Sequence, residues 1–144
     1  MKLASTARRG FTLIELLVVI AIIGILSAVV LASLNTARSK GADAAIKSNV
    51  DNSRAQAELF YDSAGNSYAG VCANSSTGIG GMVTGARNAG SATVNCGDTA
   101  TGWAMNAQLK TNTAQYFCVD STGVSTTTSG STIVNGASSS DVVC

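Results

Sequence analysis

The chain has 144 residues, a hydrophobic fraction of 46% and a formal net charge of +1 at pH 7. It contains no histidine, the commonest general base, and no glycine-rich phosphate loop that ends in Lys-Ser or Lys-Thr, so we do not expect an enzyme. Beyond residue 64 the basic side chains are Arg87 and Lys110, too few for a surface that follows a phosphate backbone, so nucleic-acid binding is not indicated.

The N-terminal region combines a basic start with a long uncharged stretch. Two arginines precede Gly10 and Phe11, and residues 16–34 contain no charged side chain. A helix of this length measures about 28 Å, close to the hydrocarbon thickness of a bilayer, so the stretch can span a membrane. Glu15 lies at its edge. An ionisable group in mid-membrane costs about 2.5 to 3.5 kcal/mol on insertion scales, so Glu15 requires a functional explanation and a partner.

This combination resembles the N-termini of type IV pilus prepilins and of type II secretion pseudopilins. The shared features are the basic leader Met1–Arg9, the junction between Gly10 and Phe11, Glu15 four residues past that junction, and the apolar run behind it. The resemblance implies that a prepilin peptidase at the cytoplasmic face cuts after Gly10 and that Phe11 becomes the N-methylated first residue. It also implies that Glu15 attracts the terminal amino group of an adjacent subunit during filament assembly. Pairing a carboxylate with an ammonium lowers the penalty of each in hydrocarbon and fixes the register between neighbours.

Three other kinds of N-terminal segment share some of these features. A secretory signal peptide has a shorter apolar core of about 7 to 15 residues and rarely carries a glutamate at its edge. A lipoprotein signal requires a cysteine directly after the apolar region, and the first cysteine is Cys72, which excludes this class. A plain single-pass anchor with an incidental Glu15 is a further alternative. The complete motif favours the prepilin type.

Residues 35–64 predict an amphipathic continuation of the same helix. Apolar residues recur at spacings of three, four and seven, which is the pattern of one helix face. The expected apolar face consists of Ile46, Val50, Ala57 and Phe60 or Tyr61, and the charged residues Asp43, Lys47, Asp51, Arg54 and Glu58 are expected on a solvated face. We expect the helix to end at Ser63–Asn66, where a glycine can take the left-handed conformation.

Residues 65–144 predict a small β-rich domain in which glycine, serine, threonine and asparagine dominate. Trp103–Leu109 and Tyr116–Val119 are candidate strands of a hairpin around residues 110–113, and Ser131–Val134 is a candidate third strand. Because large apolar side chains are few, the sheet must pack on the helix and rely on covalent links. The predicted fold class is α+β, a long N-terminal helix packed on a small antiparallel sheet.

The four cysteines predict disulfides. Cys72, Cys96, Cys118 and Cys144 follow one another at intervals of 24, 22 and 26 residues, which excludes the short pairs of zinc ribbons and thiol oxidoreductases. Three connectivities are possible. We favour Cys72 with Cys96 and Cys118 with Cys144, because each of these pairs closes a local loop.

Metal binding has weaker support. The carboxylates beyond the helix belong to Asp98, Asp120 and Asp141. By resemblance to some pseudopilins they could contribute to a calcium site, but single aspartates in turns are more often local caps. We therefore expect no metal site and no cofactor.

These features divide the chain into four expected parts. They are a cytoplasmic leader at residues 1–10, a transmembrane and filament-core helix at 11–34, an amphipathic continuation at 35–64 and an outer domain at 65–144. Removal of the leader leaves six basic and eight acidic side chains in the mature chain.

The resemblance implies a structural subunit of a type IV pilus-like surface filament, with roles in adhesion, motility or uptake. The alternatives are a type II secretion pseudopilin and an anchored binding domain that does not polymerise. The expected partners are other copies of the chain, the prepilin peptidase and methyltransferase, the inner-membrane assembly platform with its ATPase, and membrane lipid before assembly. The precursor is expected in the inner (cytoplasmic) membrane, and the mature form in an extracellular pilus or a periplasmic pseudopilus.

Overall fold

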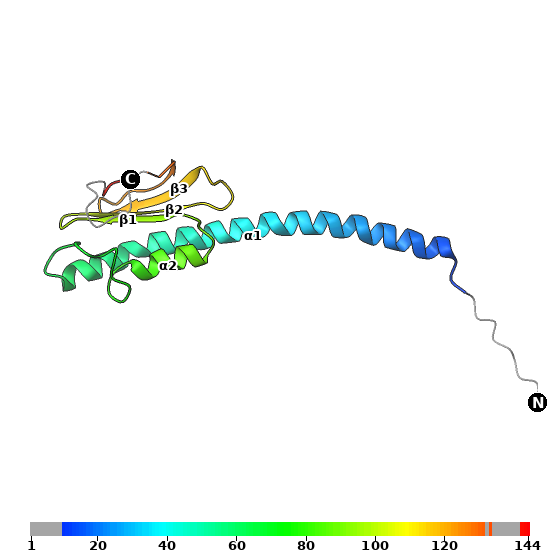
Figure 1. Ribbon diagram of the computed structural model, residues 1–144, viewed down its shortest axis with the longest axis horizontal. Coiled ribbons are helices and arrows are strands. Elements are labelled where there is room, and N and C mark those ends of the chain that lie inside the picture. Colours follow the sequence, from blue (N-terminus) through cyan, green and yellow to red (C-terminus); the bar gives the residue numbers. More distant parts are fainter. Residues whose placement is uncertain (1–9, 132, 134–141) are drawn as a thin grey trace, which may run out of the picture. The chain divides into compact units, whose positions relative to one another are not determined.

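A computed structural model describes residues 10–131, 133 and 142–144. The chain divides into an N-terminal unit, residues 1–36, and an outer unit, residues 37–144. Helix α1, Leu13–Ser63, has residues in both units. The outer unit adds helix α2, Gly80–Asn88, and strands β1, Val94–Asp98, β2, Trp103–Gln108, β3, Gln115–Asp120, and β4, Ser125–Ser129 (Figure 1).

Helix α1 ends where the sequence predicts, at a glycine. Gly65 and Asn66 both adopt positive φ, at 71° and 64°. The N–H of Asn66 donates to the carbonyl of Tyr61 at 3.0 Å, a hydrogen bond of the Schellman type that closes helix ends around a left-handed glycine. The predicted stop at Ser63–Asn66 is therefore confirmed.

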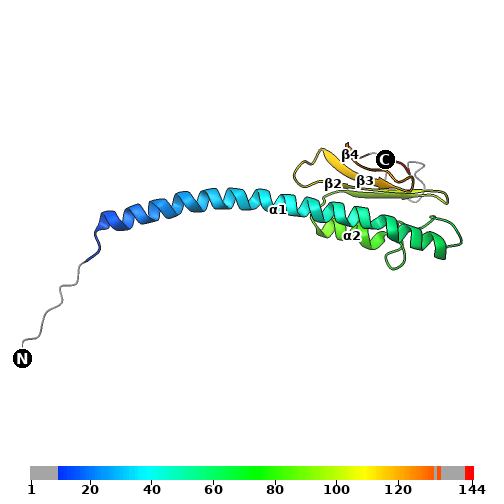
Figure 2. The ribbon, with the colours of Figure 1, turned by 180° about the vertical axis from the view of Figure 1, so that it is seen from behind.

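Helix α2 lies beside the outer part of α1 in both views (Figures 1 and 2). The two helices come close at Gly85, where an added Cβ would meet the side-chain oxygen of Asn49 on α1 unless that side chain moved. The loop before α2 is closed by the N–H of Ile79, which donates to the carbonyl of Val71 at 2.9 Å. The sequence pattern did not predict α2, because a nine-residue helix that contains three glycines lacks a clear helical signal.

The strands form one antiparallel sheet in the order β1-β2-β3-β4. The predicted hairpin is present as β2 and β3, with Met105 opposite Val119 in the register. β1 and β4 were not predicted, because their residues are mainly small or polar. The strand expected at Ser131–Val134 is not found as predicted. Ser131 and Ile133 lie in no strand, and the other two positions lie outside the described residues.

The main core lies between α1 and one face of the sheet. From the sheet, Trp103 is 1% exposed, and Met105 and Val119 are fully buried. From the helix, the buried members are Ile46, Val50, Ala57 and Phe60, with Tyr61 packed at the edge. The predicted apolar face of the helix is confirmed, and the fold is the expected pilin-like α+β class.

C-terminal residues cover part of the opposite face of the sheet. Ala104 and Cys118 pack there against Ile133, with Cys144 at the edge of the cluster. The N–H of Cys144 donates to a carboxylate oxygen of Asp120 at 2.9 Å. Both faces of the central strands are therefore buried, although the core contains few large side chains.

A buried polar network completes this opposite face. The amide nitrogen of Asn95 donates to the amide oxygen of Asn106 at 3.1 Å and to the hydroxyl of Ser131 at 2.7 Å. Ser131 donates in turn to the carbonyl of Ile133 at 2.9 Å. Because buried polar groups are costly when unpaired, this chain of hydrogen bonds holds Ser131 and Ile133 in one position on the sheet.

Two disulfides link the outer unit. Cys72 on the loop after α1 is bonded to Cys96 on β1, and Cys118 on β3 is bonded to Cys144. These are the pairs that the sequence favoured. Loops of this size stabilise a fold by about 3 to 4 kcal/mol each in the chain-entropy view, a large contribution for so small a core.

The predicted solvated face of α1 is partly wrong. Asp43 is only 9% exposed, and its carboxylate accepts the backbone N–H of Lys110 at 2.5 Å. It also accepts the N–H and the hydroxyl of Thr111. Asp43 therefore fastens the β2–β3 turn to the helix, and its charge is used inside the fold.

The other charged residues of this face also reach the sheet or its loops. Lys47 and Arg54 are half-buried, whereas Asp51 and Glu58 remain exposed as predicted. The ammonium of Lys47 lies 5.5 Å from the centre of the Phe117 ring, and the guanidinium of Arg54 donates to the Gly123 carbonyl at 3.0 Å. Asp51 accepts the Ser125 hydroxyl at 3.2 Å, and Glu58 accepts the Tyr68 hydroxyl at 2.9 Å. Helical periodicity correctly predicted the buried face of the helix. It could not predict the contacts that turns and loops distant in sequence make with the sides of the helix.

Replacement of Asp43 by alanine should destabilise the outer unit, because the N–H groups of Lys110 and Thr111 lose their acceptor. Hydrogen bonds to charged groups contribute about 1.5 to 3 kcal/mol, and we expect a decrease of that size in the free energy of unfolding. Urea unfolding of the full chain in detergent, followed by the fluorescence of the single buried Trp103, measures it. The exposed Asp62 provides the matched control, and Asp62→Ala should change the value by less than about 0.5 kcal/mol. Equal losses in the two variants would contradict the role of Asp43.

We expect the stability of the outer unit to depend on pH through Asp120. Burial raises the pKa of Asp120, but hydrogen bonds from Cys144, Thr122 and Val124 outweigh burial and hold this pKa below its ordinary value of 3.8. A carboxyl whose pKa falls on folding stabilises the fold above the unfolded pKa, and this contribution is lost as pH falls through the folded pKa. The wild-type chain should therefore lose more stability than Asp120→Asn when the pH is lowered from about 5 to 2. If the two proteins lose the same stability over this pH range, Asp120 is not the group whose protonation destabilises the fold.

Candidate assembly segment

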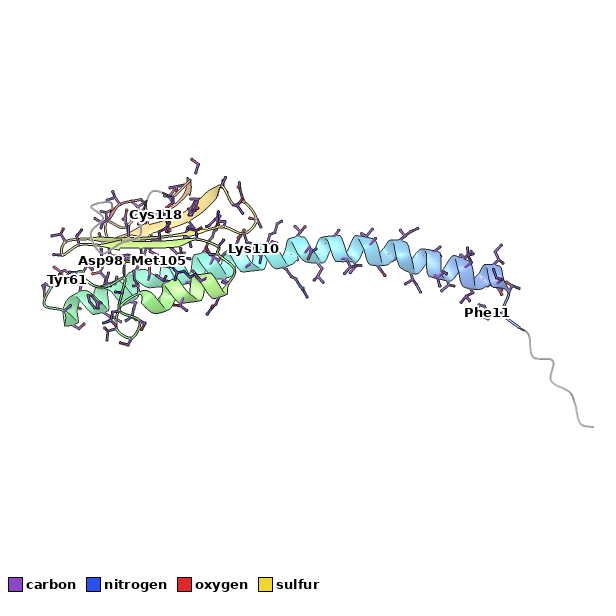
Figure 3. All side chains as sticks on the ribbon, in the orientation of Figure 1. Phe11, Tyr61, Asp98, Met105, Lys110 and Cys118 are labelled. Carbon is purple, nitrogen blue, oxygen red and sulfur yellow. A yellow bond between two sulfur atoms is a disulfide. The ribbon has the colours of Figure 1, made fainter. Side chains whose placement is uncertain are left out.

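The N-terminal unit contains an apolar surface that the described residues of the chain leave uncovered. Sixteen large apolar side chains from Phe11 to Leu34 are between 43% and 81% exposed. Side chains project above and below this part of the helix in Figure 3. The helix is long and apolar enough to cross a membrane, with a mean hydropathy of 3.0 over its most apolar 18 residues and none of that window buried. Full burial of such a side chain is worth about 1.5 to 3 kcal/mol, so this surface needs lipid or protein around it.

The first turn of α1 is held by a capping box. Both the N–H and the hydroxyl of Thr12 donate to Oε2 of Glu15 at 2.8 Å, and the N–H of Glu15 donates to the Thr12 hydroxyl at 3.3 Å. These bonds satisfy N–H groups that a helix start leaves without partners. Glu15 therefore has hydrogen-bond donors within its own chain, and the charge still lacks a counter-ion among the described residues.

The two oxygens of the Glu15 carboxylate differ. The two hydrogen bonds from Thr12 go to Oε2, and Oε1 has no partner in the part of the chain that the structure describes. An ionised carboxylate offers about four acceptor positions. Glu15 can thus keep its helix cap and at the same time accept an external cation at Oε1.

Gly10 and Phe11 lie just before this turn. Among the described residues, no packing contact requires a glycine at residue 10 or a phenylalanine at residue 11. A methyl group built on Gly10 would meet nothing within 4 Å, and Phe11 is 81% exposed. The fold itself therefore does not require glycine at residue 10.

The structure thus brings three of the predicted site residues, Gly10, Phe11 and Glu15, together at the start of α1. The predicted cysteine set lies in the outer unit, as two disulfides. Thr12 was missed by the sequence analysis. The signal was available, because a threonine three residues before a glutamate at the head of an apolar run is the capping-box pattern.

The candidate calcium ligands are used for other contacts. Asp98 is 5% exposed and accepts the N–H of Gly70 at 2.6 Å, and Asp120 accepts the donors given above. Asp141 lies outside the described residues. Within the described ranges no three histidine, cysteine, aspartate or glutamate side chains are grouped as metal ligands. Asp120 caps its own turn through Thr122 and Val124, whereas Asp98 joins β1 to the loop at Gly70.

The outer unit has a small polar hollow between the two helices. Its volume is about 180 Å³, below the range of about 300 to 1,000 Å³ that is usual for ligand pockets. It is lined by Asn49, Gln56, Ser75, Ser76, Gly78, Gly81 and Met82. With neither charge nor an enclosed apolar wall, it does not define a ligand site.

Comparison with known proteins agrees with the geometry of the N-terminal segment. The prokaryotic N-terminal methylation motif matches residues 5–31, and this motif is the prepilin-type signal of type IV pilins and pseudopilins. No curated protein and no solved structure matches the chain.

The motif supports a type IV pilin-like or pseudopilin precursor. Pilins and pseudopilins are structural subunits and not enzymes, and their signal implies processing by a prepilin peptidase and assembly into a pilus-type polymer. Together with the apolar helix, it is consistent with a membrane-anchored precursor and an extracellular or periplasmic filament.

Replacement of Gly10 by leucine should block removal of the leader and leave the folded chain unchanged, because the space around Gly10 is open. Intact-protein mass spectrometry of membranes shows whether residues 1–10 remain. Gly24→Leu is the matched control, since Gly24 also has open space around it but lies within the apolar helix, and it should be processed normally. Normal processing of the Gly10 variant would remove the argument for cleavage at this position.

Proposed function

We propose that this chain is a structural subunit of a type IV pilus-like surface filament. The observation that carries the proposal is the exposed apolar surface of residues 11–34 next to the Glu15 carboxylate, whose Oε1 has no partner among the described residues. In the precursor, lipid covers this surface. In the filament, the same surface of neighbouring copies replaces the lipid, so the helix is never left in water.

Cleavage after Gly10 creates the group that Glu15 lacks. It releases the amino group of Phe11, which is a cation at neutral pH and enters the same apolar environment as the carboxylate. An unpaired charge in hydrocarbon is costly, and a geometry in which the Phe11 ammonium of one copy meets Oε1 of Glu15 on another lowers the penalty of both. Thr12 supports this arrangement, because its hydrogen bonds hold Oε2 and fix the orientation of the carboxylate.

We assign the four expected parts of the chain accordingly. Residues 1–10 are the cytoplasmic leader, 11–34 the membrane and filament-core helix, 35–64 its amphipathic continuation and 65–144 the outer domain. The partners are other copies of the chain, the prepilin peptidase and methyltransferase, and an inner-membrane assembly platform with its ATPase. The role is structural and requires no catalysis, cofactor or nucleic acid.

A pseudopilin of a type II secretion system is the second candidate, because the matched motif is common to both classes. The two differ in where the polymer is found, outside the cell or confined to the periplasm. An anchored domain that never polymerises would keep lipid around residues 11–34 permanently.

Sheared cell-surface material distinguishes these cases. Filaments that contain a chain starting at N-methylated Phe11, identified by mass spectrometry, would support the pilus assignment. Processed protein in periplasmic polymers would favour the pseudopilin. Processed protein found only as single copies in the membrane would overturn the assembly function.

Replacement of Glu15 by alanine should leave membrane insertion intact and prevent incorporation into filaments. This variant also loses the capping contacts of the Glu15 carboxylate, so Thr12→Ala is the matched control: it removes the two hydrogen bonds of the Thr12 hydroxyl, keeps the backbone N–H of residue 12 as a donor to Oε2, and keeps the carboxylate. Loss of a cap costs about 1 kcal/mol, and Thr12→Ala should still assemble. The ratio of sheared to membrane-bound protein, measured by immunoblot, compares the two. Wild-type yields from Glu15→Ala would show that the carboxylate is not needed.

A further inference from the structure

The sheet of the outer unit ends in two edge strands, β1 and β4 (Figures 1 and 2). The edge of β1 is covered, because Cys96 is bonded to Cys72 on the loop after α1, and the guanidinium of Arg87 on α2 donates to the carbonyl of Val94 at 3.3 Å. The residues of β4 are exposed, apart from the half-buried Thr128. β4 contains neither a charged residue nor a proline, the usual features that protect an edge from pairing with another strand.

The hydrogen bonds next to β4 show which of its backbone groups face outward. The N–H of Gly130, the residue after β4, donates to the carbonyl of Ala114 at 2.9 Å, so Gly130 points to the β3 side. In an antiparallel ladder, residues that bond to the neighbouring strand alternate with residues whose backbone groups point away from it. Ser125, Thr127 and Ser129 therefore direct their N–H and C=O groups away from β3. In the described part of the chain these groups have no hydrogen-bond partner.

The sequence of β4 reads the same in both directions, Ser-Thr-Thr-Thr-Ser, and is symmetric about Thr127. When two such strands pair antiparallel about this centre, Thr127 lies opposite its own copy and Ser125 lies opposite Ser129. All outward-facing residues of one strand then meet outward-facing residues of the other, which allows about six hydrogen bonds, whereas a register shifted by two residues allows about four within β4. Threonine and serine pairs across strands are also favourable contacts.

We propose that β4 is an interaction site for a second copy of this chain, whose own β4 extends the sheet in antiparallel orientation, centred on Thr127. The side chains that β4 uses inside the fold do not occupy this edge of the backbone. The hydroxyl of Ser125 donates to Asp51 at 3.2 Å, and the hydroxyl of Thr128 donates to the carbonyl of Gly130 at 3.1 Å. The outward N–H and C=O groups of β4 therefore stay available to the second copy.

A second copy fits this edge better than an extended segment of an unrelated protein. Strand edges that select a foreign peptide do so through pockets for alternate side chains, and β4 offers only hydroxyl and methyl groups. A strand that is symmetric in sequence finds its best match in itself. Residues 121–140 contain no charged side chain, so two copies also meet there without like-charge repulsion.

The contact is isologous, because each copy contributes the same strand. Once two copies have paired, both edges are used, so this contact gives a pair and does not extend a polymer. Copies within one filament follow one another by the same head-to-tail step, so we place the pair between copies of different filaments. That placement rests on the proposed filament, whereas the pairing of two copies does not. One pair of short strands is weak, but many pairs along two filaments act together.

Thr127→Cys in the full chain tests the pairing and its register. In the proposed pair, residue 127 faces its own copy at a Cα–Cα distance of about 5.5 Å, which suits a disulfide. After mild oxidation of cells, non-reducing gels of the sheared and membrane fractions should show at least about fivefold more covalent dimer than the wild-type chain gives. The wild type measures the background, because its own cysteines are paired within one copy.

Ser129→Cys is the matched control, because it introduces the same thiol on the same exposed strand. In the proposed register residue 129 lies opposite residue 125 of the second copy, about 14 Å from its own counterpart at about 3.4 Å per residue. This distance is too long for a disulfide, so Ser129→Cys should give no more dimer than the wild type.

Thr127→Lys tests the contact between filaments. It places two like charges opposite each other in every pair, so the share of filaments that sediments at low speed should fall about fivefold, with the total yield within about twofold of the wild type. Thr113→Lys adds the same charge at an exposed threonine of the β2–β3 turn and should sediment like the wild type. Unchanged urea unfolding would confirm that both variants are folded.

Equal dimer yields from Thr127→Cys and Ser129→Cys, or no dimer from either, would overturn the pairing. A covalent product that contains another protein would assign the edge to a foreign strand and overturn it as well. If Thr127→Cys forms the dimer but Thr127→Lys filaments sediment like the wild type, only the contact between filaments is wrong. If the wild type forms no filament, the proposed function fails, and the dimer of Thr127→Cys in membranes still decides the pairing.

Discussion

The structure of this protein depends most on an apolar surface that its described residues leave uncovered. The large apolar side chains of residues 13–34 are exposed, so this surface needs lipid or protein around it. Both kinds of contact are non-directional, and neither selects one position of a neighbour over another. In the proposed filament Glu15 would supply direction, because a carboxylate oriented by Thr12 accepts a cation from a limited set of angles. On this proposal the apolar residues account for the affinity of assembly, and the polar turn at their head accounts for its register.

The outer unit has a sheet with few large apolar side chains, so its hydrophobic core is small. One face is covered by α1, and the opposite face by residues near Cys144 and by the polar network around Asn106. Hydrogen bonds to charged side chains, such as that of Asp43 to the β2–β3 turn, replace contacts that a larger core would provide. Two disulfides then limit the freedom of the unfolded chain. The unit is thus held together by a small core, buried polar bonds and covalent links in combination.

The sequence predicted those parts of the fold that depend on strong local signals. The limits of α1, its buried face, the hairpin of β2 and β3 and the residues at the Gly10 junction all follow from periodicity, glycine or an established motif. β1 and β4 were missed because their side chains are small or polar and their strands exist only through pairing with neighbours. Asp43 was placed in solvent because its partners, Lys110 and Thr111, are distant in sequence and supply backbone N–H groups. The side chains of Lys110 and Thr111 therefore give no sequence signal for a contact with Asp43.

The attachment of the sheet to α1 has a mechanical consequence. Along one helix, Asp43, Arg54 and Glu58 bond to three separate segments, the β2–β3 turn, the β3–β4 turn and the loop that follows α1. A force that pulls the sheet parallel to the helix axis loads the Asp43 and Arg54 contacts together, in shear, because both of them join α1 to turns of the sheet. A force directed away from the helix would instead break them one after another. The outer unit is therefore built to resist traction along the direction of its helix better than peeling from it.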